Sequence, residues 1–161
     1  MAALLAHHNQ KYDIFPYEKH LRDVVRIIQK FFGDDETLII SAWLHDSIED
    51  TYLTYNKIKQ VFGIEVAEIV FAVTDELGRN RAERHDKTLP KIQAAGWKAI
   101  AVKLADRIAN VEHSVKSNHE LFDMYRREYA EFSHALYSES QEVKPMWDYI
   151  HCLMQNMNKL P

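Results

Sequence analysis

Residues 38–50 read Leu-Ile-Ile-Ser-Ala-Trp-Leu-His-Asp-Ser-Ile-Glu-Asp, and no other stretch of the chain is as informative. An apolar helical run suddenly carries four ionisable groups within six positions: His45, Asp46, Glu49 and Asp50. On a helix, residues four apart are neighbours, so His45 would face Glu49 and Asp46 would face Asp50. Burying such groups without partners costs roughly several kcal/mol. They are therefore expected to be paired or bound to a metal, although a helix end that turns into solvent also often carries acids.

The composition is that of one globular domain. The chain has 161 residues, 47% of them hydrophobic and 27% charged, which excludes a disordered chain. The single cysteine, Cys152, excludes an internal disulfide and a multi-cysteine metal site. The net charge of −4 disfavours nucleic-acid binding, and no apolar run approaches the roughly 20 residues that span a bilayer. Because the N-terminus also lacks a signal-peptide pattern, we expect a soluble cytoplasmic domain with neither nucleic-acid nor membrane partners.

Apolar residues recur at spacings of three and four, as on amphipathic helices, without convincing strand alternation. The pattern predicts helices near residues 1–9, 17–32, 35–49, 55–62, 64–76, 98–116, 119–137 and 145–157. Residues 79–95 are expected to form one or two short helices, broken near Pro90. We therefore predict an all-α fold, a compact helical bundle that forms a single domain over residues 1–161. The helix at about 145–157 would cap the bundle or form the dimer face of a homo-oligomer.

A second polar window lies in residues 102–110, Val-Lys-Leu-Ala-Asp-Arg-Ile-Ala-Asn. Asp106 and Asn110 are one helical turn apart, and their apolar flanks suggest burial. Lys103 and Arg107 form a second pair at the same spacing and could hold the carboxylates in place. Taken alone, the window is equally typical of an ion-pair lattice on an amphipathic helix.

A third piece is His20, which opens a helix directly after Pro16 and Tyr17. A single histidine in such a place is more often structural than a ligand. Together with the two windows it completes a set of two imidazoles and two carboxylates: His20, His45, Asp46 and Asp106. Mixed nitrogen and oxygen donors suit a divalent transition metal such as Mn, Fe, Co or Zn. Four protein ligands would leave positions open for water and a phosphate oxygen if the ion is six-coordinate.

This set resembles the signature of the HD-domain metal-dependent phosphohydrolases. Within that superfamily, the motifs His-Asp-x-x-Glu-Asp at residues 45–50 and Lys-Leu-Ala-Asp-Arg-x-x-Asn at residues 103–110 resemble those of the (p)ppGpp hydrolases. These comprise the hydrolase half of the RelA/SpoT enzymes and the stand-alone small alarmone hydrolases. The resemblance extends from about residue 8 to residue 132, the motif-bearing core of the domain.

The resemblance implies an all-helical fold of the HD-domain type, one bound Mn²⁺, and removal of the 3′-pyrophosphate from guanosine 3′,5′-bis(diphosphate) or its pentaphosphate form, leaving GDP or GTP. The positions that match the family's metal ligands are His20, His45, Asp46 and Asp106. Glu49 and Asp50 match the acidic pair that assists a metal-activated water. The residues do not distinguish which of the two carboxylates is the base.

The resemblance also suggests contacts with the nucleotide. Residues 10–12, with Lys11, are similar to a basic segment that lies against the guanine, although Lys11 could equally be a solvated lysine. The family usually has a glycine before its Pro-Tyr pair, where this chain has Ile14 and Phe15, so the lip of the base pocket is expected to differ. Asn110 matches a residue near the ribose and phosphates.

A local positive charge of +3 over residues 79–91 is the remaining signal for substrate binding. In an acidic chain, such a cluster is where a polyphosphate could be held. The resemblance favours phosphate contacts from Arg81, Lys87 and Lys91, while the alternative is a solvated connecting helix. Tyr129, followed by Phe132, is similar to an aromatic segment that closes the nucleotide pocket, but periodicity alone would place both in the core.

Two other functions remain open at this point. The first is an HD phosphohydrolase that acts on another nucleotide: a nucleoside monophosphate, a dNTP, a 3′-phosphorylated nucleotide, or NADPH. The second is a binding protein that keeps the fold without catalysis. The Glu49–Asp50 pair favours the alarmone class, and a binding protein would usually have lost a ligand or an acid.

Overall fold

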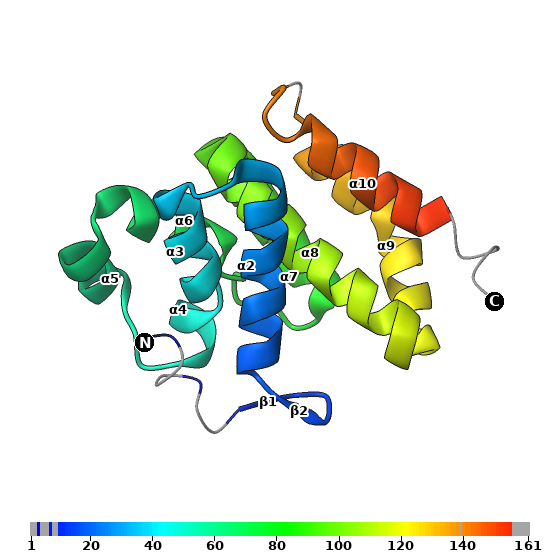
Figure 1. Cartoon of the computed structure of the whole chain (residues 1–161), viewed down its shortest axis with the longest axis horizontal. Coiled ribbons are helices and arrows are strands. Elements are labelled where there is room, and N and C mark those ends of the chain that lie inside the picture. Colours follow the sequence, from blue (N-terminus) through cyan, green and yellow to red (C-terminus); the bar gives the residue numbers. More distant parts are fainter. Residues whose placement is uncertain (1–2, 4–6, 8–9, 139, 156–161) are drawn as a thin grey trace.

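The chain was analysed as a computed structural model that describes residues 3, 7, 10–138 and 140–155. Most of the helix expected over residues 1–9 lies outside the described residues, as do residues 156–157 of the last predicted helix. The helices are α2 (Glu18–Phe32), α3 (Glu36–Leu44), α4 (Ser47–Asp50), α5 (Tyr55–Phe62), α6 (Ile64–Val73), α7 (Arg81–Ala95), α8 (Trp97–Ser117), α9 (His119–Leu136) and α10 (Lys144–Gln155). The predicted all-α fold is confirmed (Figure 1).

Helix α8 is the centre of the bundle. It packs against α2, α3, α6, α7, α9 and α10. In Figure 1, α3 to α6 lie on one side of α2, and α9 and α10 lie on the other. Residues 99–102 of α8 are all buried, and so are Leu104 and Ala105, which means that this helix is enclosed on every side over its first half. A helix that is apolar all round is typical of a core position. A polar group on α8, such as Asp106, is therefore held at a precise depth.

The helix predicted over residues 35–49 is interrupted, which corrects the prediction. Helix α3 ends at Leu44, and α4 begins at Ser47. Asp46 has φ −97° and ψ 0°, outside the helical region. On an unbroken helix, adjacent side chains point about 100° apart. The break lets His45 and Asp46 face the same point, and burial of both groups around a shared charge outweighs the lost helical geometry.

The break predicted near Pro90 is also wrong, because α7 is one helix of 15 residues that contains Pro90. Proline removes one helical hydrogen bond, here to the carbonyl of Asp86, and both residues are exposed. The opposite face of α7 buries His85, Thr88, Leu89 and Ile92. This packing holds the helix together across the proline, while the solvent can hydrate the free carbonyl.

The sequence pattern also did not predict a small antiparallel hairpin formed by β1 (Lys11–Tyr12) and β2 (Phe15–Pro16). Its register pairs Lys11 with Pro16 and Tyr12 with Phe15. Asp13, in the turn, has a φ of 58°, a left-handed value that aspartate tolerates better than most residues. Two-residue strands are too short to show an alternating pattern. Within the part of the chain that the structure describes, no helix has the length and apolarity needed to cross a membrane.

The place of Pro90 gives a prediction about stability. Pro90→Ala restores the missing helical hydrogen bond at an exposed site, so we expect the free energy of unfolding to rise by about 1–2 kcal/mol, after allowance for the entropy that proline removes from the unfolded chain. Pro145→Ala is the control, because Pro145 is the second residue of α10 and needs no N–H there. Urea denaturation of both variants measures the difference. Destabilisation by Pro90→Ala would mean that the ring itself supports the helix.

Candidate metal centre and its surroundings

Four polar side chains from three parts of the chain converge beside α8. His20 comes from the first turn of α2, His45 and Asp46 from the break between α3 and α4, and Asp106 from the middle of α8. The Nε2 atoms of His20 and His45 are 3.2 Å apart. Asp46 Oδ2 is 2.9 Å from Nε2 of His45, and Asp106 Oδ1 is 3.4 Å from Nε2 of His20. Both imidazoles are 97% buried, with 3% relative exposure.

The hydrogen bond of His45 Nδ1, the ring nitrogen that points away from the cluster, determines the protonation of the ring. Nδ1 of His45 lies 2.9 Å from the carbonyl oxygen of Ala42. A carbonyl only accepts, so Nδ1 carries the proton and the neutral ring turns the lone pair of Nε2 inward. With a neutral ring the cluster is made of acceptors that face one another, and a shared proton or a metal ion at its centre would satisfy them.

The electrostatics of the cluster likewise favour a positive charge there. Burial by itself lowers the pKa of His45, but the adjacent Asp46 carboxylate outweighs burial and raises the pKa to about 9. Burial would raise the pKa of Asp46, whereas the His45 imidazole holds that pKa well below its usual range. A proton shared here occupies the place that a metal ion would take. The two imidazole nitrogens and the Asp46 carboxylate lie within 4.8 Å of one another and fit a divalent transition metal, and Asp106 lies beside this group, 3.4 Å from His20 Nε2.

The acidic pair lies on α4, next to the cluster. Oε2 of Glu49 accepts a hydrogen bond of 3.3 Å from the main-chain N–H of Asp75. Partial burial, then the nearby Asp75 carboxylate, raises the pKa of Glu49. Partial burial and Asp46 raise the pKa of Asp50. A carboxylate with a raised pKa is a stronger base, which is the property that activation of water requires.

Asp106 is held by two neighbours on its own helix. Nζ of Lys103 is 3.3 Å from Oδ2 of Asp106 and 3.8 Å from Oδ1 of Asp75. Nδ2 of Asn110 donates a 2.6 Å hydrogen bond to Oδ1 of Asp106. Burial lowers the pKa of Lys103, but the Asp106 and Asp75 carboxylates raise it overall, so Lys103 stays charged. Lys103 thus contacts a site carboxylate as expected, whereas Arg107 binds a different one.

Two tyrosines next to the cluster were not singled out from the sequence. The Tyr17 hydroxyl donates a short hydrogen bond to Oδ2 of Asp46. The Tyr12 hydroxyl donates to Oδ1 of Asn110 at 2.8 Å. Tyr17 is three residues before His20, so helical spacing could have placed it near the site. Tyr12 lies on the hairpin, for which the sequence carried no signal.

The residues predicted to bind phosphate are all paired within the chain. Arg81 forms hydrogen bonds of 2.6 and 3.1 Å with the Glu128 carboxylate, which also binds Arg107 at 3.0 Å. Lys87 contacts Glu83 at 3.0 Å, and Lys91 contacts Glu76 at 2.6 Å. The positive cluster is thus largely neutralised by neighbouring acids.

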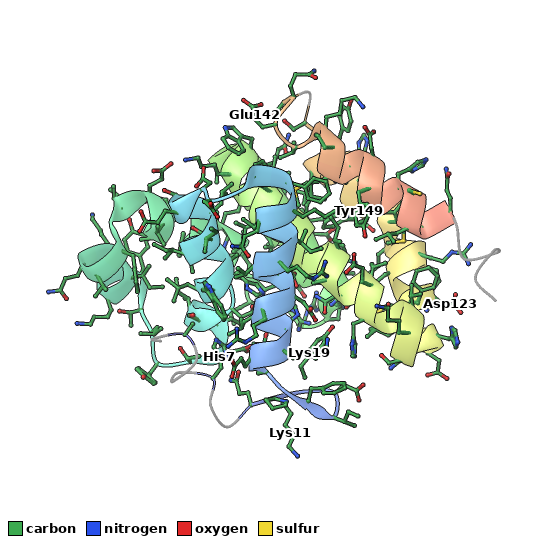
Figure 2. The ribbon with its side chains drawn as sticks, viewed as in Figure 1. His7, Lys11, Lys19, Asp123, Glu142 and Tyr149 are labelled. Carbon is green, nitrogen blue, oxygen red and sulfur yellow. The ribbon has the colours of Figure 1, made fainter. Side chains whose placement is uncertain are left out.

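The other predicted substrate residues are spread around the site. Lys11 is exposed on the hairpin and points away from the helices (Figure 2). Asn110 lies against Asp106, as described above. Tyr129 is partly buried on α9, packed against the core. Contacts of these residues with a substrate stay a prediction.

Comparison with known proteins places the chain in a family. Residues 1–139 match the HD domain family, so the chain belongs to it. The (p)ppGpp hydrolases that the two motifs resemble are also among the relatives. The chain is 36% identical over 110 residues to the guanosine-3′,5′-bis(diphosphate) 3′-pyrophosphohydrolase MESH1 of Danio rerio, a match that covers 65% of this chain and 61% of the relative. Human MESH1 is 30% identical over 120 residues, covering 73% and 67%.

Solved structures agree on the fold. A structure described as "A metazoan ortholog of SpoT hydrolyzes ppGpp and plays a role in starvation responses" has a TM-score of 0.77 at 24% identity, covering 92% of this chain and 89% of that one. The lmo0812 protein of Listeria monocytogenes has a TM-score of 0.71 at 25% identity, covering 88% and 94%. The chain spans 54–61% of the length of the first three curated relatives.

The geometry predicts that Asp106 is essential for metal binding. Asp106→Asn keeps the shape and a donor or acceptor for Asn110, but it removes the charge. We expect affinity for a divalent metal to fall by more than about 100-fold, beyond what loss of an outer partner causes. Metal content by mass spectrometry and titration calorimetry measure this. The control is Asp123→Asn, on the exposed face of α9. Equal metal content in the two variants would contradict a ligand role for Asp106.

Proposed function

We propose that this protein is a metal-dependent (p)ppGpp 3′-pyrophosphohydrolase, which cleaves guanosine 3′,5′-bis(diphosphate) or its pentaphosphate form to GDP or GTP and pyrophosphate. The observation that carries the proposal is the convergence of His20, His45, Asp46 and Asp106 with the Glu49–Asp50 pair beside them. The activity named for the MESH1 relatives supports the choice of substrate.

In this proposal the four converging side chains hold one divalent ion, for which Mn²⁺ is our choice from the resemblance. Such an ion, when bound, polarises a phosphate oxygen and lowers the pKa of water. The neutral His45 ring, oriented by the Ala42 carbonyl, presents its Nε2 lone pair, and Tyr17 orients the Asp46 carboxylate. These contacts fix the ligand atoms before the ion arrives.

Glu49 and Asp50 orient the attacking water and take its proton in this proposal. The Asp75 N–H holds Glu49 from one side, and the Gln10 side chain donates a 2.9 Å hydrogen bond to the main-chain carbonyl of Asp50. These contacts hold the Glu49 carboxylate and the main chain of Asp50, and the raised pKa values of both carboxyl groups favour proton uptake.

The substrate phosphates would contact the cations that the sequence singled out: Arg81, Lys87 and Lys91. A phosphate offers the same two-oxygen geometry as a carboxylate, so it can replace Glu128 at the Arg81 guanidinium. We assign contacts with the nucleoside part to Lys11, Asn110 and Tyr129. A substrate phosphate would then bind by replacing a carboxylate in an existing ion pair, because these cations are already paired.

One observation favours a second candidate. Because all three cations in this cluster are already paired with acids, the site suits a substrate with fewer phosphates almost equally well. NADPH, which carries a single phosphate on the 2′-oxygen of its adenosine ribose, belongs to this class. The shared centre would then remove one phosphate instead of a pyrophosphate.

An assay with purified protein, Mn²⁺ and ppGpp separates these possibilities. Chromatography should show GDP and intact pyrophosphate, and EDTA should abolish both products. Release of inorganic phosphate from NADPH, with no turnover of ppGpp, would establish the second candidate. Absence of turnover on a nucleotide panel in metal-loaded protein would contradict an enzymatic function.

The acidic pair gives a prediction about the chemical step. Glu49→Gln and Asp50→Asn should each keep the metal, because neither belongs to the four converging groups, while kcat falls by about 10²- to 10⁴-fold. Steady-state kinetics with measured metal content tests this. Glu65→Gln is the control, since Glu65 pairs with Lys98 on the surface. Wild-type turnover in one of the two site variants would make that carboxylate structural.

The paired cations give a prediction about binding. Replacement of Arg81, Lys87 and Lys91 by glutamine should raise KM for ppGpp more than it lowers kcat, by about 10-fold or more, because hydrogen bonds to charged groups contribute roughly 1.5–3 kcal/mol each. Lys98→Gln, which breaks a comparable surface ion pair, is the control. An unchanged KM in the triple variant would place the cluster outside the substrate site.

A further inference from the structure

Tyr12 belongs to the N-terminal hairpin, yet it contacts residues of both α2 and α8 beside the candidate metal centre. Its hydroxyl donates to Asn110 Oδ1 at 2.8 Å, and its ring stacks on the His20 ring with centroids 4.8 Å apart and planes inclined by 28°. On the other side, the ring lies 4.6 Å from that of His113. Tyr12 is thus enclosed between two imidazoles, with its hydroxyl directed towards α8.

Two hydrogen bonds connect Tyr12 to Asp106 through Asn110, and the chemistry of the acceptor atoms sets the direction of each. A carboxylate only accepts, so Asn110 must turn its amide N–H towards Asp106. The amide oxygen then faces Tyr12, whose hydroxyl must donate. The oxygen that Asn110 holds is Oδ1 of Asp106, the atom 3.4 Å from His20 Nε2. The Tyr12 hydroxyl therefore acts on a ligand atom through one intermediate side chain.

His20 lacks the support that His45 has. Nδ1 of His45 bonds to a main-chain carbonyl, whereas Nδ1 of His20 is buried with no hydrogen-bond partner among the described residues. Metal-binding histidines are normally oriented through this second nitrogen. For His20 the aromatic neighbours take over this task, with Tyr12 stacked on it and Tyr17 tilted against it at 5.5 Å.

The hairpin is anchored so that it can hold Tyr12 in place. Asp13, directly after Tyr12, lies 3.4 Å from Nε2 of His113 on α8. The Tyr17 N–H donates to the carbonyl of Gln10 at 3.1 Å, which closes the base of the hairpin. The turn therefore connects to α8 and to the start of α2, the two helices that carry Asp106 and His20.

We infer that Tyr12 is a positioning residue of the metal centre: its hydroxyl, through Asn110, orients Asp106, and its ring orients His20. The inference rests on the proposed metal centre, but it does not depend on which nucleotide is the substrate. In this structure both halves of the Asn110 amide are engaged, the oxygen by Tyr12 and the nitrogen by Asp106.

Mn²⁺ titration of the metal-free protein by calorimetry tests this inference without substrate. Tyr12→Phe removes only the hydroxyl, and we expect the Kd to rise about 10-fold, the lower end of the 10- to 100-fold effect of outer-shell partners. Tyr12→Ala also removes the ring from His20, and we expect a rise towards 100-fold. Tyr55→Phe is the matched control, because Tyr55 also donates to a carboxylate, Glu68, but on the exposed surface.

A double-variant cycle shows whether the hydroxyl acts through Asn110. If it does, Tyr12→Phe combined with Asn110→Ala should weaken Mn²⁺ binding no more than Asn110→Ala alone. The melting temperature of metal-free Tyr12→Phe should match that of wild type, which separates positioning from a general structural role.

The outcomes separate the two hypotheses. An unchanged Kd for Tyr12→Phe in a protein whose wild type binds Mn²⁺ would overturn the inference alone. If the increases in Kd of the two single variants multiply in the double variant, the two side chains act independently, and the path through Asn110 is overturned. A wild type that binds no Mn²⁺ would overturn the metal centre of the proposed function, and with it the role of Tyr12.

Discussion

The structure depends on one constraint: buried acceptor atoms face each other where α2, α8 and the α3–α4 break meet. The Nε2 atoms of His20 and His45 are 3.2 Å apart with carboxylate oxygens beside them, an arrangement that requires a shared proton or a metal ion. Other features follow from this requirement. The chain breaks its helix at residues 45–46, and α8 is buried on both flanks of Asp106, at residues 104–105 and 107–109.

The side chains that converge could be singled out from the sequence because their spacing is local. His45 and Asp46 are adjacent, and Lys103, Asp106 and Asn110 are separated by three or four positions, so each window carries its own pattern. His20 was placed by its family motif, and it does lie with the others. The predicted helices near 17–32, 55–62, 98–116 and 119–137 also correspond to α2, α5, α8 and α9, since apolar periodicity alone determines those elements.

The features that the sequence did not predict depend on contacts between distant residues. The local charge of +3 over residues 79–91 includes the charge of Arg81. It omits Glu128, which lies 47 positions away in the sequence and neutralises Arg81 in the structure. Tyr12 and Asn110 are separated by 98 positions, and the strand that carries Tyr12 has two residues. The unbroken α7 likewise reflects buried packing on the face opposite Pro90, which outweighs a local preference. Pattern analysis cannot detect these effects, because they arise from tertiary contacts.

The distribution of charge has a consequence for how such a centre works. Glu49, Asp50 and Asp75 surround the cluster, while Lys103 is already engaged by carboxylates. A polyphosphate that approaches the metal-free protein therefore meets more negative than available positive charge, and repulsion between like charges opposes its binding. An added divalent charge and the release of Arg81 from Glu128 both reverse this balance. In the proposed function, metal binding therefore precedes substrate binding, and the roles that we propose for Tyr17 and Tyr12 in holding the ligands contribute to both steps.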